Sequence, residues 1–212
     1  MKSIYFLPVR VCFAVGFFIA GVGSLHAQNP YLVVPGVKVV AITRRSSEAD
    51  LKRIYGQKNV RRAEVGIGEG ETMPGTVIYP DDSTRTVHII WKDEQRRRFP
   101  QSIHLGGNVW KTAQGIGLGT SLRQLERLNG RAFTLSGFGW DYSGTIDSWK
   151  GGKLERALKN DKWTVIRLGI ETTPKVTDAE LESVMGELEF SSGNRVMRRI
   201  NPTIYQLIVM FP

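Results

Sequence analysis

One pattern, repeated three times at constant spacing, constrains the fold of this chain more than any other feature of its sequence. A Ser or Thr is followed three residues later by an acid or Gln, then directly by Leu, and five residues after that Leu by Gly. The copies occupy residues 47–56, 121–130 and 177–186. Because an internal repeat indicates a repeated structural unit, we expect each copy to form the same element.

Each copy predicts a short helix with a signal at both ends. The Ser or Thr hydroxyl can accept a hydrogen bond from the first turn, and the side chain three residues on can reach back to the cap N–H, forming a capping box. Asp50 is a short substitute for Glu in this role, so the first box is the weakest. The closing glycine can adopt the left-handed conformation that ends a helix. Helices this short are marginal alone, so their apolar stripes must pack against another element.

The segments after each helix predict that element. Runs of β-branched and aromatic residues alternate with polar ones and are bounded by Gly, Asn, Asp and Pro, which is typical of strands and turns. The expected fold class is α+β, with tandem helix–β-meander repeats whose short helices pack on one face of a mainly antiparallel sheet. We expect a first αββ module with a leading strand at 28–105, and a second αββ module with a C-terminal helix–strand repeat at 106–212, joined in one compact unit.

Residues 1–27 predict a cleaved signal peptide. Lys2 and Arg10 give a positive start, residues 11–22 form an uncharged apolar run, and small residues lead to Ala27, the expected cleavage site. The apolar run is shorter than the roughly 20 residues that span a bilayer, so we expect no transmembrane segment after cleavage. The expected location is therefore periplasmic or secreted.

The sequence lacks the residue patterns of most catalytic classes. The single cysteine, Cys12, lies in the predicted signal, so no thiolate nucleophile or cysteine metal site is expected in the mature chain. Beyond the signal, His88 and His104 lie in no metal-binding motif, and no Gly-x-Ser-x-Gly sequence is present. We expect no catalytic residue, no metal and no cofactor, and an enzyme is the less favoured interpretation.

Two glycine strings resemble fragments of nucleotide-binding loops. Residues 66–70 lead into acidic residues and Pro74, where a phosphate would be repelled. Residues 115–119 precede the second predicted helix, whose N-terminus would suit an anion. They lack the glycine spacing of a dinucleotide fingerprint and the Lys of a P-loop. We therefore expect no nucleotide, and nucleic acid is a disfavoured partner.

Acidic and aromatic residues remain as candidates for a binding site. Glu69 and Glu71 are two carboxylates close together, as a glycosidase pair or a Ca²⁺ site would need. Phe138, Trp140 and Tyr142 alternate with small or acidic residues, so on a strand all three would point to one face. That face could be either core or a binding surface.

The second repeat resembles known modules. Residues 117–130 followed by 139–142 resemble the module of β-lactamase-inhibitor-like proteins and of the small outer-membrane-assembly lipoproteins of the SmpA/OmlA type. Residues 68–77 and 137–145 resemble an uncharacterised family of exported bacterial proteins. The first resemblance implies protein binding through a sheet face. The chain lacks the lipid-bearing cysteine of the lipoproteins, so outer-membrane anchoring is not expected.

We therefore expect an exported, non-enzymatic binding or scaffold protein that engages a protein or cell-envelope component through an aromatic sheet face. One alternative is an envelope glycan hydrolase with Glu69, Glu71 or Asp141 as acid and base. The other alternative is a polyanion-binding surface protein, since the formal net charge is +9. Its candidate cations are four groups of adjacent arginines: Arg44–Arg45, Arg61–Arg62, Arg96–Arg98 and Arg198–Arg199.

Overall fold

The computed structural model describes residues 30–158, 163–170 and 176–212. The expected signal peptide at 1–27 and its cleavage site lie outside these residues. Within the described part of the chain, no helix is both long and apolar enough to cross a membrane.

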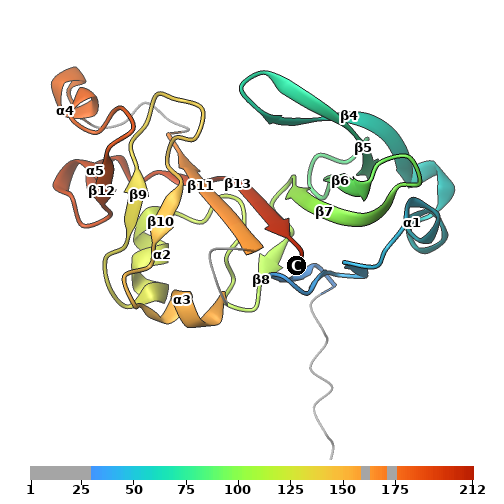
Figure 1. Cartoon of the computed structure of the whole chain (residues 1–212). Helices are drawn as coiled ribbons and strands as arrows, with labels where there is room; N and C mark the ends of the chain where they lie inside the picture. The colour runs from blue at the N-terminus through green and yellow to red at the C-terminus, as the bar shows by residue number, and fades with distance from the viewer. Residues whose placement is uncertain (1–29, 159–162, 171–175) are drawn as a thin grey trace, which may run out of the picture.

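The largest element is a six-stranded antiparallel sheet with the strand order β11-β13-β7-β6-β5-β4 (Figure 1). Its strands are β4 (Val60–Gly68), β5 (Glu71–Ile78), β6 (Val87–Asp93), β7 (Arg98–Leu105), β11 (Thr164–Gly169) and β13 (Thr203–Met210). The last strand, β13, pairs with β7 on one side and β11 on the other. The sheet therefore joins strands from both of the ranges that the sequence separates at residues 105 and 106.

Two smaller sheets and six short helices complete the described fold. One sheet contains β1 (Leu32–Val34), β2 (Lys38–Val39), β3 (Ile42–Thr43) and β8 (Lys111–Thr112), and the other contains β9 (Thr134–Ser136), β10 (Ile146–Ser148) and β12 (Glu189–Ser191). The helices are α1 (Glu48–Tyr55), a 3-10 turn η1 (Gln57–Asn59), α2 (Leu122–Asn129), α3 (Lys153–Ala157), α4 (Asp178–Glu182) and α5 (Arg195–Ile200). The expected α+β class with mainly antiparallel strands and short helices is confirmed.

All three predicted capping boxes are confirmed. Each N-cap hydroxyl, from Ser47, Ser121 and Thr177, accepts from the N–H three residues on, and the side chain at that position accepts from the N-cap N–H. The C-termini agree less well with the prediction. Gly130 ends α2 in the left-handed conformation (φ 77°, ψ 4°), whereas Gly56 has φ 89° and ψ 140° and α4 ends at Glu182, before Gly186.

The expected tandem arrangement on one shared sheet is not confirmed. Helix α1 contacts β4 and β5 of the six-stranded sheet, whereas α2 contacts α3. Figure 1 shows α2 beside the three-stranded sheet in the other half of the molecule, and α4 at the outer end of that half. The repeat therefore specifies three capped helices, but the long-range strand pairing places them in different surroundings.

One continuous apolar core runs through both halves of the described chain. Ile89, Ile103 and Leu207 supply it from the six-stranded sheet, and all three have no exposed surface. Leu51 of α1 and Leu125 of α2 are equally buried in it. Helices α1 and α2 thus contribute these leucines to the core, as their apolar stripes predict, whereas Leu181 of α4 is only half-buried.

A buried carboxylate holds α1 against the six-stranded sheet. Glu48, only 7% exposed, accepts a hydrogen bond of 3.0 Å from the hydroxyl of Thr76 and pairs with Lys52 and with Arg97 Nε at 3.2 Å. Trp91 Nε1 in turn donates to Thr76 Oγ1 at 2.9 Å. Burial acts to raise the pKa of Glu48, but the hydrogen bonds and the positive charges outweigh it and lower that pKa below 4.5.

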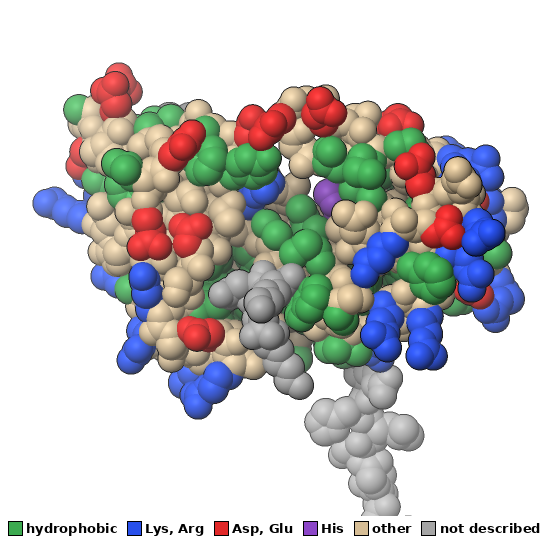
Figure 2. Space-filling model, in the orientation of Figure 1, with side chains coloured by type: hydrophobic (Ala, Val, Ile, Leu, Met, Phe, Trp, Pro, Cys, Tyr) green, Lys and Arg blue, Asp and Glu red, His purple; other side chains and the backbone are tan. Residues whose placement is uncertain are grey.

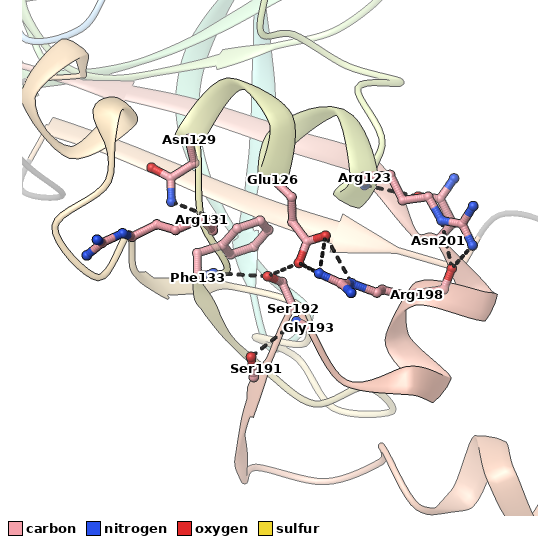
Figure 3. Close-up of polar contacts among 10 residues, drawn as sticks. All are labelled: Arg123, Glu126, Asn129, Arg131, Phe133, Ser191, Ser192, Gly193, Arg198 and Asn201. Atoms are coloured by element: carbon pink, nitrogen blue, oxygen red, sulfur yellow. Dashed lines mark hydrogen bonds and ion pairs between the residues drawn. The ribbon is translucent and has the colours of Figure 1, made fainter.

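A second carboxylate ties α2 to the C-terminal elements, as Figure 3 shows. Glu126 accepts from the hydroxyl of Ser192 at 2.8 Å and from the guanidinium of Arg198, and Ser192 Oγ accepts from the N–H of Phe133 at 2.9 Å. On the same helix, Arg123 Nη2 donates to the carbonyl of Arg198 at 2.8 Å. Helix α2, β9, the end of β12 and α5 are thus held together by polar contacts.

We predict that Glu48→Gln lowers the free energy of unfolding by about 2 kcal/mol at pH 7. This is less than the roughly 3–5 kcal/mol for breaking a fully buried pair, because the partner cations keep some contact with water. The matched control is Asp81→Asn, which removes a pair with Arg61 in which both side chains are more than half exposed, and should cost less than about 1 kcal/mol. Urea unfolding measures both.

The pH dependence distinguishes the charge of Glu48 from its shape. Because its folded-state pKa is lowered, its stabilising charge is fully present above the unfolded value of 4.5 and is lost as the pH falls through the lower folded value. The difference in free energy of unfolding between wild type and Glu48→Gln should therefore shrink below pH 4.5. This account would be contradicted if Glu48→Gln lost the same free energy of unfolding at pH 7 and pH 3, or no more than Asp81→Asn loses at pH 7.

Candidate functional site

The aromatic segment 138–142 forms a turn and not the expected strand. Phe138 makes only an isolated bridge to Met185, and bends and turns follow it through Gly144. Gly139 and Gly144 have φ of 84° and 65°, and a Cβ on Gly144 would lie 1.9 Å from the carbonyl oxygen of Leu168. The expectation that three aromatic side chains share one strand face is therefore wrong, because glycine conformations close the backbone into a turn.

The three aromatic residues have different environments. Phe138 is buried in the core, 4% exposed. Trp140 is half-buried, and its Nε1 donates to the carbonyl of Gly137 at 3.1 Å. Tyr142 is 36% exposed, and its ring meets that of Trp140 edge to face with centroids 5.5 Å apart. Phe138 is therefore core, whereas Trp140 and Tyr142 are at the surface.

A contact between two distant segments brings Glu69 to Tyr142. Glu69 lies at the tip of the β4–β5 hairpin, where Glu69 and Gly70 have φ of 53° and 75°. Positive φ at both central residues favours a tight hairpin turn. The hydroxyl of Tyr142 donates to Glu69 Oε1 at 2.7 Å, and this hydrogen bond raises the pKa of Tyr142. Glu71 is exposed at the start of β5.

Arg167 of β11 joins this contact from the sheet. The centre of its guanidinium lies 4.9 Å from the centroid of the Tyr142 ring, within the range of a cation–π interaction. Arg167 Nε donates to Thr145 Oγ1 at 3.1 Å and Nη1 donates to Gln206 Oε1 at 2.6 Å. The guanidinium is therefore held in place from both sides.

Tyr205 adds a second exposed ring on the face of the sheet that carries Arg167. A Cβ on Gly169 would lie 2.8 Å from Tyr205 Cδ1, so this ring covers Gly169. Gly169 and Arg167 share a face of β11 because they are two residues apart on a strand. Tyr205 is 41% exposed and lies at a register shift between β11 and β13. We call the group of Glu69, Trp140, Tyr142, Arg167 and Tyr205 the Tyr142 surface.

Arg167 and Tyr205 are not predicted from the sequence, because neither lies in a local motif. A bridge between Thr145 and Arg167 brings β11 to the turn that carries Tyr142, and the irregular pairing of β11 with β13 places Tyr205 over Gly169 of the same strand. A register shift of this kind can re-aim a side chain, and such irregularities are common next to functional sites.

The charges on the face seen in Figure 2 are unevenly distributed. Acidic and hydrophobic side chains gather along its upper edge, over the β4–β5 hairpin and the β9–β10 connection, while Lys and Arg gather below and at the sides. A hollow lies between the two halves, with hydrophobic side chains and a histidine visible in it. The Tyr142–Glu69 contact links the two elements at the upper edge.

His88 and His104 are cross-strand neighbours on β6 and β7. His104 Nε2 lies 3.1 Å from Ser102 Oγ. Burial, with smaller contributions from the charges of His88 and Arg167, lowers the pKa of His104 to about 4, and burial also lowers the pKa of His88. Both rings are therefore neutral at pH 7. In the described part of the chain, no group of three or more His, Cys, Asp or Glu could hold a metal ion.

Comparison with known proteins gives a distant structural neighbour and no sequence match. No family model and no curated protein matches the chain. The structure is similar to the crystal structure of the uncharacterized protein yfeY from Escherichia coli, with a TM-score of 0.40 and 10% sequence identity over 83% of this chain and 95% of that one. The similarity is thus to an uncharacterised bacterial protein, and it is too distant to carry an argument about function.

We predict that His104 destabilises the fold in acid. Its folded-state pKa of about 4 lies below the unfolded value of 6.5, so as the pH falls between these values the unfolded chain binds a proton that the folded chain does not. The free energy of unfolding should fall across this window by at most about 3 kcal/mol from this residue. His104→Gln, which stays neutral, should lose less stability than wild type between pH 7 and pH 4.

The measurement is urea unfolding at several pH values for wild type, His104→Gln and the neighbouring control His88→Gln. The control should reduce the acid loss by a smaller amount, because burial lowers the pKa of His88 less than that of His104. If the free energy of unfolding fell in parallel with pH for wild type and His104→Gln, His104 would not be responsible for the loss of stability in acid.

Proposed function

We propose that this chain is an exported, non-enzymatic binding protein that engages a protein of the cell envelope through the Tyr142 surface. The observation that carries the proposal is the hydrogen bond of 2.7 Å between Tyr142 and Glu69, which fixes a partly exposed ring at the surface. The proposed export rests on the sequence of residues 1–27.

The chemistry of this surface suits protein recognition. Trp, Tyr and Arg are the residues most enriched among those that dominate binding energy at protein interfaces. Here the ring of Tyr142, 36% exposed, lies against Arg167, whose polar partners are Thr145 after the turn and Gln206 on β13. Tyr205, 41% exposed, covers Gly169 on the same strand as Arg167. Because Tyr142 and Arg167 are already held in place, little side-chain freedom would be lost on binding.

The resemblance of the second repeat to β-lactamase-inhibitor-like and SmpA/OmlA-type modules supports the same proposal. The resemblance implies a protein partner bound through a sheet face. In this chain the candidate surface combines a turn, a hairpin tip and the edge strand β11, so it differs from the sheet face that the resemblance implies. We keep the protein partner as part of the proposal.

The geometry does not favour the glycan hydrolase. Glu69, Glu71 and Asp141 are all exposed. A carboxyl that acts as general acid at neutral pH needs a raised pKa, which burial usually supplies. Glu69 accepts a hydrogen bond from Tyr142. The three carboxylates suit the acidic rim of a binding surface better than a catalytic pair.

The geometry also does not favour a broad polyanion-binding surface. Three of the four arginine groups contain members that pair with carboxylates, which neutralises part of their charge. These pairs are Arg61–Asp81, Arg62–Glu48, Arg97–Glu48, Arg96–Asp93, Arg198–Glu126 and Arg199–Glu180. Arg44 and Arg45 are exposed, but two residues make a small surface for a polymer.

Site-specific photo-cross-linking tests the proposal. A photoreactive phenylalanine analogue at position 142, in the chain expressed in its own cells, should cross-link to one protein of the envelope. The matched control is position 99, where Phe99 is 40% exposed and lies away from the Tyr142 surface at the start of β7. The same species captured from both positions, or none from position 142, would contradict the proposal.

Affinity measurements with the captured protein then identify the residues responsible. Tyr142→Ala and Arg167→Ala should each weaken binding at least tenfold, since truncation of a central interface residue costs about 2 kcal/mol or more. Phe99→Ala should change the affinity less than twofold. Unchanged binding by both Tyr142→Ala and Arg167→Ala, with thermal unfolding confirming that they fold, would place the interface elsewhere.

A further inference from the structure

A cavity of about 650 Å³ lies in front of α2 and shares no residue with the Tyr142 surface. Its lining includes the cations Lys111 and Arg127, the amides Asn108 and Gln114, and the apolar Leu118 and Leu128. A neighbouring cavity of about 380 Å³ shares Asn108, Leu118 and Gly119 with it. Volumes of several hundred cubic ångströms are typical of sites for small molecules.

The charge of this cavity is positive. No Asp or Glu is among the described residues that line it. Within the described chain neither Lys111 nor Arg127 forms an ion pair with a carboxylate, in contrast to most members of the arginine groups. Two cations without a local counter-charge attract an anion, and an open cavity gives that anion access.

The ammonium of Lys111 loses hydration on folding and gains few hydrogen-bond acceptors in return. Its side chain is half-buried, and its ammonium, which has three N–H donors, donates to the carbonyl of Leu118 at 3.1 Å. Burial lowers the pKa of Lys111 below its ordinary value of 10.5. A bound anion would accept from the remaining donors and restore the stability of the charged form.

The glycine string 115–119 shapes the wall of the cavity around this lysine. A Cβ on Gly117 would lie 2.1 Å from the carbonyl oxygen of Trp110 and 2.7 Å from Lys111 Cδ. Gly115 and Gly119 have φ of 77° and 80°. The three glycines therefore let the loop turn and pack closely against Trp110 and Lys111. This close packing accounts for the glycine string, which lacks the features of a nucleotide-binding loop.

The N-terminus of α2 itself is not the anion site. The N–H of Leu122 donates to Pro202 O at 2.8 Å and that of Arg123 donates to Asn201 Oδ1 at 3.1 Å. The third N–H, from Gln124, donates to the cap hydroxyl of Ser121. Since these donors are occupied, recognition of an anion here depends on side chains.

We propose that this cavity binds a small amphipathic anion. Lys111 and Arg127 hold its phosphate or carboxylate group, with hydrogen bonds from the amides of Asn108 and Gln114. Leu128, which is 37% exposed, and Leu118 contact its apolar part. Leu128 is the one leucine of the α2 stripe that is not in the core, and this role accounts for its exposure.

Calorimetric titration of the full chain with three eight-carbon probes tests the ligand class. Octyl phosphate and octanoate share the apolar part and differ in the anion, and 1-octanol has no charge. At least one anion should bind at least tenfold more tightly than 1-octanol, and the tighter of the two identifies phosphate or carboxylate as the preferred group. Equal binding of all three probes, or binding of none, would overturn the proposal.

Variants then test the residues. Lys111→Gln/Arg127→Gln should weaken the preferred anion at least tenfold and leave 1-octanol unaffected. The matched control, Lys58→Gln/Arg156→Gln, makes the same change of net charge at two exposed cations outside the cavity. Equal losses in both double variants, or no loss in either, would show that the cavity cations do not hold the anion. Thermal unfolding without ligand confirms that each variant folds.

Discussion

The pairing of β13 with both β7 and β11 is the interaction on which the rest of the structure depends. Figure 1 shows β13, close to the C-terminus, lying beside β7 in the middle of the six-stranded sheet. Its register places Leu207 opposite Leu105 and Val209 opposite Ile103, and all four side chains are buried. Without this strand, β11 would have no place in the sheet, and the turn that carries Tyr142, which is bridged to β11 at Arg167, would lose its link to the sheet.

Two carboxylates, the buried Glu48 and the half-buried Glu126, complement this pairing by attaching the short helices. Glu48 joins α1 to Thr76 of β5 and to Arg97, and Glu126 joins α2 to Ser192 and Arg198. Helices of eight residues are marginal in isolation, so a cap alone does not stabilise them. The caps determine where these helices begin, while the carboxylates and the buried leucines determine where they lie.

The two candidate sites have different chemistry and are built in different ways. The Tyr142 surface consists of aromatic rings and an arginine held by polar partners, as recognition of another protein requires. The cavity in front of α2 is a concave, cationic site of small-molecule size. Because they share no residue, a single partner is not needed to explain both, and each can be tested without disturbing the other.

The sequence alone determined the features that depend on neighbouring residues. These are the three capping boxes, the α+β class, and the choice of Glu69 and Tyr142 as candidates, since caps, alternation and turn glycines act over a few positions. Only the tertiary structure decided that residues 138–142 turn, that Glu69 meets Tyr142, and that Arg167, Tyr205, Lys111 and Arg127 line sites. The physical reason is that these contacts follow from strand pairings between segments far apart in the chain, and no local pattern specifies which strands will pair or in what register.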